Sequence, residues 1–184
     1  RKMKVLHRGY CYAKKIWKSA RSAASCKGHG RGRLHIPTDS RKTWILSVIR
    51  DLYDNSIIAY RTGTEQNINL VLNTIKAAKR KEKVTAQLQL HSDQGFQYTS
   101  QAYYKLTQRY GVTPSMSRRG NPYDNALAEN FFSILKTECI YRAKIATLAE
   151  ARELIDDYIY FYNNQRIQTK TKLTPMEFRR QYVA

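Results

Sequence analysis

The chain has 184 residues, enough for one domain with a sizeable buried core. It carries 33 Lys and Arg against 14 Asp and Glu, and a net charge of +19 favours a polyanionic partner, nucleic acid before a membrane surface. Three scattered cysteines do not suggest a disulfide framework and fit the reducing cytoplasm, and no apolar run approaches the roughly 20 residues of a membrane span.

The positive charge is concentrated at the start of the chain. Residues 1–50 hold 14 of the Lys and Arg and one acid, Asp39. We expect a helix between Cys11 and Ala24, then a glycine-rich connector, and then a short strand from Leu34 to Thr38. The sequence therefore divides into a basic N-terminal arm, residues 1–37, and a core, residues 38–184.

The core begins with a predicted hairpin. Residues Trp44–Arg50 are apolar and β-branched, which is typical of a buried strand, and Ser56–Thr62 forms its partner. Asp54 and Asn55 mark the turn between them. Apolar residues at helical spacing then predict an amphipathic helix over residues 67–81.

Strands and helices alternate after this hairpin. Residues 86–91 predict a strand, 100–110 a helix that ends at Gly111, 112–116 a short strand and 124–140 a helix.

Two capping patterns mark the last helices. Thr147 with Glu150 is a capping box at the start of a long helix, and Thr174 with Glu177 begins the last one, with Pro175 at its first position. The order of elements predicts an α/β fold in which helices flank a mixed sheet.

Two acids occupy positions where chemistry is expected. Asp93 follows the strand that ends at His91, and Glu129 lies near the start of the helix that follows a polar loop. Carboxylate oxygens are the ligands that Mg²⁺ and Mn²⁺ prefer. In the plainer interpretation, Asp93 caps a turn and Glu129 forms a surface ion pair.

The flanking motifs carry a family resemblance. They are His91–Gly95, Ser115–Glu129, Leu46–Asp54 and Tyr158–Pro175, and 35 residues separate Asp93 from Glu129. Over residues 38–183 the chain resembles the catalytic core of insertion-sequence transposases related to retroviral integrases, the Asp-Asp-Glu group with a ribonuclease-H-like fold. The resemblance implies DNA strand cleavage and strand transfer during transposition, with three carboxylates binding two Mg²⁺ or Mn²⁺ ions.

The resemblance assigns the three acids to Asp39, Asp93 and Glu129. Asp39 lies seven positions before Leu46, about half the usual family spacing, which leaves open that the first strand is truncated. Asp51 is the fallback for the first acid, although it matches a family residue that binds no metal. The truncation leaves open an inactive remnant that only binds DNA. A ribonuclease-H-type nuclease on the same fold is a further alternative.

Basic residues near the acids are candidates for DNA contact. Lys136 resembles the family lysine beside the cleaved phosphate, and Arg118 and Arg119 are candidate phosphate contacts. For each, a solvated side chain is the plainer interpretation. His91 either supports Asp93 or is a strand-end histidine with its own partners. The resemblance also implies a homo-oligomer and an upstream helix-turn-helix segment or subunit that recognises the ends of the element.

Overall fold

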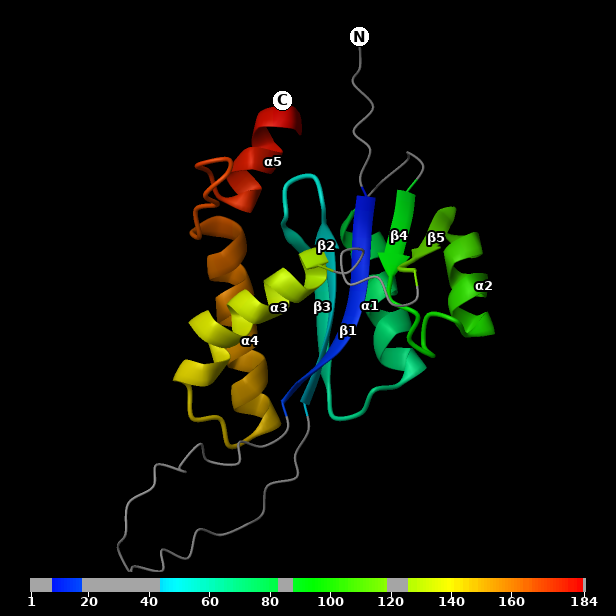
Figure 1. The fold of residues 1–184 in the computed structure, drawn as a ribbon, viewed down its shortest axis with the longest axis horizontal. Coiled ribbons are helices and arrows are strands. Elements are labelled where there is room, and N and C mark those ends of the chain that lie inside the picture. Colours follow the sequence, from blue (N-terminus) through cyan, green and yellow to red (C-terminus); the bar gives the residue numbers. More distant parts are fainter. Residues whose placement is uncertain (1–7, 18–43, 83–87, 119–125, 184) are drawn as a thin grey trace, which may run out of the picture.

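The computed structural model describes residues 8–17, 44–82, 88–118 and 126–183. Within them a five-stranded sheet has the order β3-β2-β1-β4-β5 (Figure 1). The strands are β1 (Arg8–Trp17), β2 (Trp44–Asp51), β3 (Ile57–Gly63), β4 (Leu88–Ser92) and β5 (Val112–Met116). β2 is antiparallel to both of its neighbours, whereas β4 is parallel to β1 and β5. The predicted mixed sheet is confirmed.

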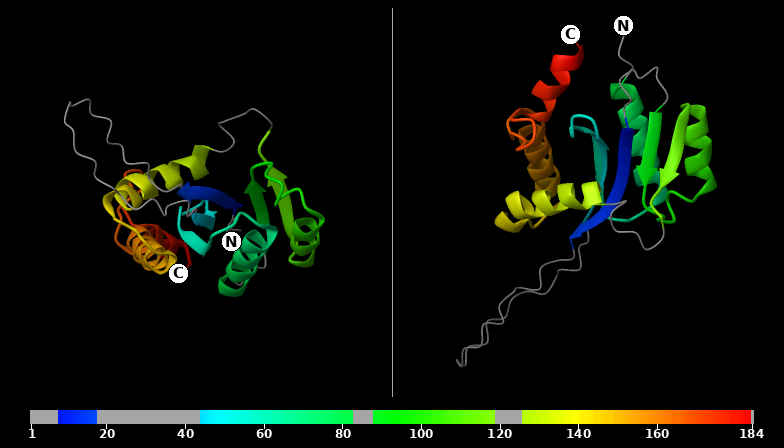
Figure 2. Two further views of the ribbon diagram at one scale, coloured as in Figure 1. Left: turned by 90° about the horizontal axis from the view of Figure 1, so that it is seen from below. Right: turned by 45° about the horizontal axis from the view of Figure 1, so that its top comes forward.

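Helices cover both faces of this sheet (Figures 1 and 2). They are α1 (Ile68–Lys81), α2 (Gln101–Arg109), α3 (Ala126–Glu138), the short 3₁₀ helix η2 (Ile140–Arg142), α4 (Leu148–Asn164) and α5 (Pro175–Val183). Leu46 and Val48 of β2 pack with α3 and α4, whereas Ile49 packs with α1 and α2. Because successive side chains of a strand point to opposite faces, β2 supports two hydrophobic clusters and is buried along its whole length.

Side-chain caps begin the helices close to the predicted positions. Asn67, Ser100 and Thr147 each accept a hydrogen bond from a backbone N–H in the first turn of α1, α2 and α4. Thr174 and Glu177 exchange hydrogen bonds in the same way at the start of α5. Local sequence signals were therefore sufficient to place these elements.

The first strand corrects one prediction. The helix expected from Cys11 is wrong for the residues up to Trp17, because Arg8–Trp17 forms β1 in the middle of the sheet. The backbone of this segment pairs with β2 along most of its length, and Arg8–Tyr10 also pairs with β4, so backbone groups that a helix would pair internally find partners in the sheet. The proposed strand from Leu34 to Thr38 lies outside the described residues, and the boundary at residue 38 stays a prediction. In the part of the chain that the structure describes, no helix is long and apolar enough to cross a membrane.

Candidate active site

Asp93 lies directly after β4 and closes a tight turn. Its Oδ1 accepts a hydrogen bond from the backbone N–H of Gly95 at 2.9 Å, and the carbonyl of Gly95 accepts one from Tyr98 at 2.9 Å. The side chain is half-buried. Asp93 therefore caps a turn, as the plainer interpretation expected, and this turn also fixes the orientation of a carboxylate at the end of the strand.

Hydrogen bonds connect this end of β4 to the segment that follows β5. His91 contacts the hydroxyl of Ser115 through Nδ1 at 2.9 Å and that of Ser117 through Nε2 at 3.1 Å. The amide of Gln94 donates to the carbonyl of Ser117, and the backbone N–H of Ser117 donates to the carbonyl of Ser92. Both ring nitrogens of His91 therefore hydrogen-bond to serine hydroxyls, which favours the interpretation of a strand-end histidine with its own partners.

Glu129 lies in the first turn of α3 and is exposed. Phe131, Phe132 and Leu135 anchor this helix in the core. α3 begins over β1, the strand beside β4, and runs outward from there (Figures 1 and 2). Glu129 therefore stands at the end of α3 that meets the middle of the sheet.

The structure places two of the other predicted site residues and does not describe the remaining two. Lys136 is half-buried on α3, seven residues after Glu129, which is two helical turns and roughly 10 Å along the axis. Arg118 is exposed at the end of the described segment that follows β5. Asp39 and Arg119 lie outside the described residues. Among the residues that are described, no three His, Cys, Asp or Glu side chains form a group that could hold a metal ion.

The fallback role for Asp51 is wrong. Asp51 is only 4% exposed, and its carboxylate accepts hydrogen bonds from the backbone N–H of Tyr53 at 2.8 Å and from Arg179 at 3.0 Å. It also ends β2, which runs antiparallel to β1 and therefore away from the edge where β4 ends. Asp51 pairs with Gly9, which pairs with Leu90, so Asp51 lies two strands away from β4 and three residues short of the level of Asp93. It is a buried ion-pair partner of Arg179.

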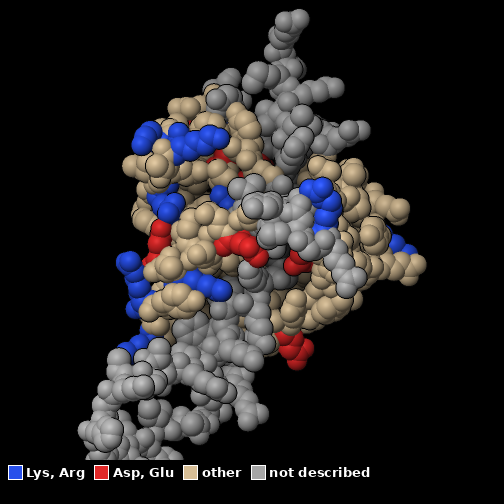
Figure 3. All heavy atoms as spheres, in the orientation of Figure 1, with Lys and Arg blue, Asp and Glu red and all other residues tan. Residues whose placement is uncertain are grey.

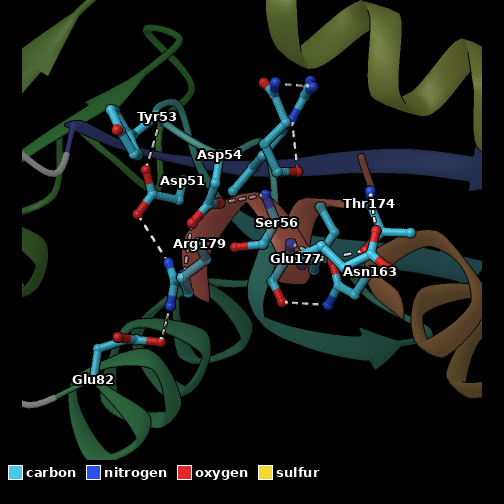
Figure 4. A network of polar contacts seen from close by, with 12 residues as sticks. Asp51, Tyr53, Asp54, Ser56, Glu82, Asn163, Thr174, Glu177 and Arg179 are labelled. Carbon is cyan, nitrogen blue, oxygen red and sulfur yellow. Dashed lines mark hydrogen bonds and ion pairs between the residues drawn. The ribbon is translucent and has the colours of Figure 1, made fainter. Parts of the chain in front are cut away.

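Arg179 is the centre of a network that the sequence did not reveal (Figure 4). Its guanidinium contacts Asp51, Asp54 at 2.5 Å and Glu82 at 2.6 Å. Asp54 is 1% exposed and also accepts a hydrogen bond from the backbone N–H of Ser56. One arginine of α5 thus neutralises carboxylates from the β2–β3 turn and from the end of α1.

The motif between Tyr158 and Pro175 also has a structural use. Asn163 accepts a hydrogen bond from the backbone N–H of Ile57 and donates one to its carbonyl. Arg166 forms a forked ion pair with Glu138, and this pairing, with the hydroxyl of Tyr158, holds the pKa of Glu138 below its usual value. Among these described residues the motif joins α4 to α3 and to the hairpin.

The surface shows how charge is arranged around the described part of the fold. On the face that shows α3, acidic side chains lie near the middle and also at the left side and below, and Lys and Arg side chains lie to the left and right of the central acids (Figure 3). Such a distribution suits a site where acids bind cations and the surrounding basic residues attract a polyanion.

Comparisons with known proteins identify the family to which the chain belongs. Two models, both described as integrase core domain, match residues 32–122 and 129–183. The protein InsK of insertion sequence element IS150, from Escherichia coli K12, is 39% identical over 144 residues, which are 78% of this chain and 50% of the relative. The transposase for insertion sequence element IS904 of Lactococcus lactis is 38% identical over 136 residues, 73% of this chain and 53% of the relative. The chain thus spans about half the length of these relatives.

Solved structures agree on the fold. The catalytic core domain of HTLV-2 integrase, in complex with magnesium, superposes with a TM-score of 0.65 at 12% identity and covers 95% of this chain and 97% of that one. The core domain of BIV integrase gives 0.65 at 18% identity, with coverages of 95% and 94%. The ribonuclease-H-like fold expected from the motifs is confirmed, and the chain belongs to the integrase core family, among relatives that are insertion-sequence transposases.

Proposed function

We propose that this chain is the catalytic core of a DNA transposase, which cleaves DNA strands and transfers them in a metal-dependent reaction. The observation that carries the proposal is the placement of two acids in a chain of this family. Asp93 follows the carboxyl end of β4, and Glu129 stands on the end of α3 that begins over the neighbouring strand. The net charge of +19 suits a DNA substrate.

The donors suit magnesium or manganese. Asp93 and Glu129 offer carboxylate oxygens, one half-buried and one exposed, and these are hard ligands for a hard cation. We propose Asp39 as the third acid and two ions in the complete site. The metal would supply charge stabilisation for the attacking and leaving oxygens. The chain itself would hold the cations with these acids and position DNA phosphates with Lys136, Arg118 and Arg119.

The proposed partners follow from the family. The matched segment makes up only about half of these relatives, and we propose that an upstream helix-turn-helix segment or subunit recognises the ends of the element. We also propose that the core acts on element-end and target DNA in the cytoplasm, as a homo-oligomer.

Nicking of duplex DNA that carries element ends tests the proposal. In Mn²⁺, the chain should produce nicks that depend on the metal, and Asp93→Asn and Glu129→Gln should each abolish them. Glu153→Gln, which alters an exposed carboxylate on α4, is the matched control and should nick normally. Equal nicking by Asp93→Asn would overturn the proposal, and a preference for RNA–DNA hybrids would favour a ribonuclease-H-type nuclease instead.

One observation favours a second candidate, an inactive core that only binds DNA. β1 occupies the position between β2 and β4, and its ten residues include no Asp or Glu. Tyr10 of β1 pairs with His91, so the β1 residue level with Asp93 is Tyr12, which pairs with Val48. A site with three acids would need its first acid at this position of the strand, opposite Val48 and level with Asp93.

The spacing before Trp44 determines whether Asp39 could occupy that position. If Asp39 joined β2 through the shortest, two-residue hairpin turn, it would lie opposite Leu46, two residues short of Val48. Asn-Gly inserted between Thr43 and Trp44 would bring it opposite Val48, on the face where α3 packs.

This insertion separates the two candidates. If the chain is inactive because its first strand is too short, the Asn-Gly insertion should create Mn²⁺-dependent nicking. Insertion of a single Gly at the same place is the control, because it would place Asp39 opposite Ser47 and turn it to the other face. Nicking by the unmodified chain would reject the inactive candidate directly.

A further inference from the structure

Gln97 carries a buried side-chain amide next to the turn that holds Asp93. The residue is 1% exposed, and within the described part of the chain neither Oε1 nor Nε2 has a hydrogen-bond partner. A buried polar group without a partner destabilises a fold and therefore calls for an explanation. Packing alone would be served better by an apolar side chain at this position.

The amide of Gln97 and the carboxylate of Asp93 approach the same point. A Cβ atom placed on Gly95 would lie 2.9 Å from Oδ1 of Asp93 and 3.0 Å from Oε1 of Gln97. Gly95 leaves this space open, and its own N–H donates to the same Asp93 oxygen at 2.9 Å. Turning the amide end over would exchange Oε1 for Nε2, so that a donor faces the carboxylate.

We propose that Gln97 is a positioning residue that donates a hydrogen bond from Nε2 to the Asp93 carboxylate when that carboxylate binds a divalent cation. The inference rests on the proposed metal-dependent function and deepens it. Groups that hydrogen-bond to a metal ligand fix its orientation, and their removal typically lowers metal affinity by about 10–100-fold. In this arrangement the Gly95 N–H and the Gln97 amide approach the Asp93 carboxylate together, and the cation binds its remaining oxygen sites.

Mn²⁺ binding to the 184-residue chain, followed by electron paramagnetic resonance, tests the role of Gln97. Gln97→Met keeps the length and shape of the side chain but removes both polar groups. It should weaken Mn²⁺ binding by about tenfold, while the Tm in the presence of EDTA stays unchanged or rises because the unpaired amide is gone. Weakened binding accompanied by a lower Tm in EDTA would overturn the proposal, since that pattern indicates a purely structural glutamine.

Asp93→Asn distinguishes failure of this inference from failure of the proposed function. If Asp93→Asn leaves Mn²⁺ binding unchanged, the proposed metal site is wrong and the inference fails with it. If Asp93→Asn abolishes binding and Gln97→Met does not weaken it, the metal site stands and Gln97 has no part in it. Loss of binding in both variants supports both proposals.

A control and a second measurement make the test specific. Ser56→Ala removes a buried hydroxyl that likewise has no partner among the described residues, in the turn between β2 and β3, and should leave Mn²⁺ affinity unchanged. In NMR spectra, the Nε2 protons of Gln97, assigned by their loss in Gln97→Met, should shift during a Mg²⁺ titration. Unshifted resonances at saturating Mg²⁺ would overturn the proposed hydrogen bond.

Discussion

Arg179 donates from Nη2 to Oδ2 of Asp51 at 3.0 Å, although the two residues are 128 positions apart in the chain. The same guanidinium reaches Asp54 through Nε and Glu82 through Nη1. α5 is therefore held to the β2–β3 turn and to the end of α1 by charge as well as by packing. This contact also explains why Asp51 is unsuited to a metal, because a cation there would compete with the guanidinium of Arg179.

Arg179→Met should strongly destabilise the fold. It leaves the carboxylates of Asp51 and Asp54 buried without their cation, and breaking a buried ion pair from one side costs about 3–5 kcal/mol. Urea unfolding followed by circular dichroism measures the loss. Arg180→Met, at the exposed neighbouring position, is the matched control and should change stability by less than about 0.5 kcal/mol. Similar losses for the two variants would show that the network contributes little.

Asn163→Leu should be costly for a different reason. Asn163 is 7% exposed and satisfies both backbone groups of the buried Ile57, at 2.8 and 3.0 Å. Without the amide these two groups lose their partners, at about 1–3 kcal/mol for each group left unsatisfied. The free energy of unfolding should therefore fall by about 2–6 kcal/mol in urea titrations. Asn164→Ala, which removes only an exposed bond to Tyr160, should have a small effect, and equal losses would contradict this account.

The elements that the sequence predicted well are those determined by local signals. Apolar periodicity located β2 and β3, and caps such as Thr147 located the starts of helices. The acids of the candidate site were found through spacing and a family resemblance, and the structure places Asp93 at a strand end and Glu129 at a helix start as expected.

Features that depend on distant partners were missed. β1 was read as a helix because nothing local in Arg8–Trp17 indicates that its backbone pairs with both β2 and β4. The partners of Asp51 were equally hidden, because the arginine that contacts it lies on the last helix. Gln97 gave no signal in the sequence, since only its burial and its closeness to Asp93 make it notable.

Glu138 should make stability depend on pH in the acid range. Hydrogen bonds from Arg166, then from Tyr158, lower its pKa below the ordinary 4.5 in the folded state. The unfolded chain therefore binds this proton first, and the stabilisation, present above the ordinary pKa, is lost as the pH falls through the folded value. The gap in unfolding free energy between the native chain and Glu138→Gln should be largest near pH 7 and should shrink toward about pH 3. Glu153→Gln, an exposed carboxylate on α4, should show no such convergence, and a gap for Glu138→Gln that is constant with pH would contradict the assignment.

Replacing Gly95 by alanine should mainly lower activity, whereas replacing Gly111 by alanine should mainly lower stability. At Gly95 a methyl group would meet Oδ1 of Asp93 at 2.9 Å and Oε1 of Gln97 at 3.0 Å, closer than such contacts normally allow. The Asp93 carboxylate must then move, so Gly95→Ala should lower Mn²⁺-dependent nicking at least about tenfold, because small displacements at a reacting centre are costly. Gly111 has a φ of +64° and open space around it, so Gly111→Ala strains the backbone at the end of α2 by about 1–2 kcal/mol without disturbing Asp93. Nicking rates together with urea unfolding of both variants separate the two effects. Normal nicking by Gly95→Ala would mean that the orientation of Asp93 set by this turn does not matter for the reaction.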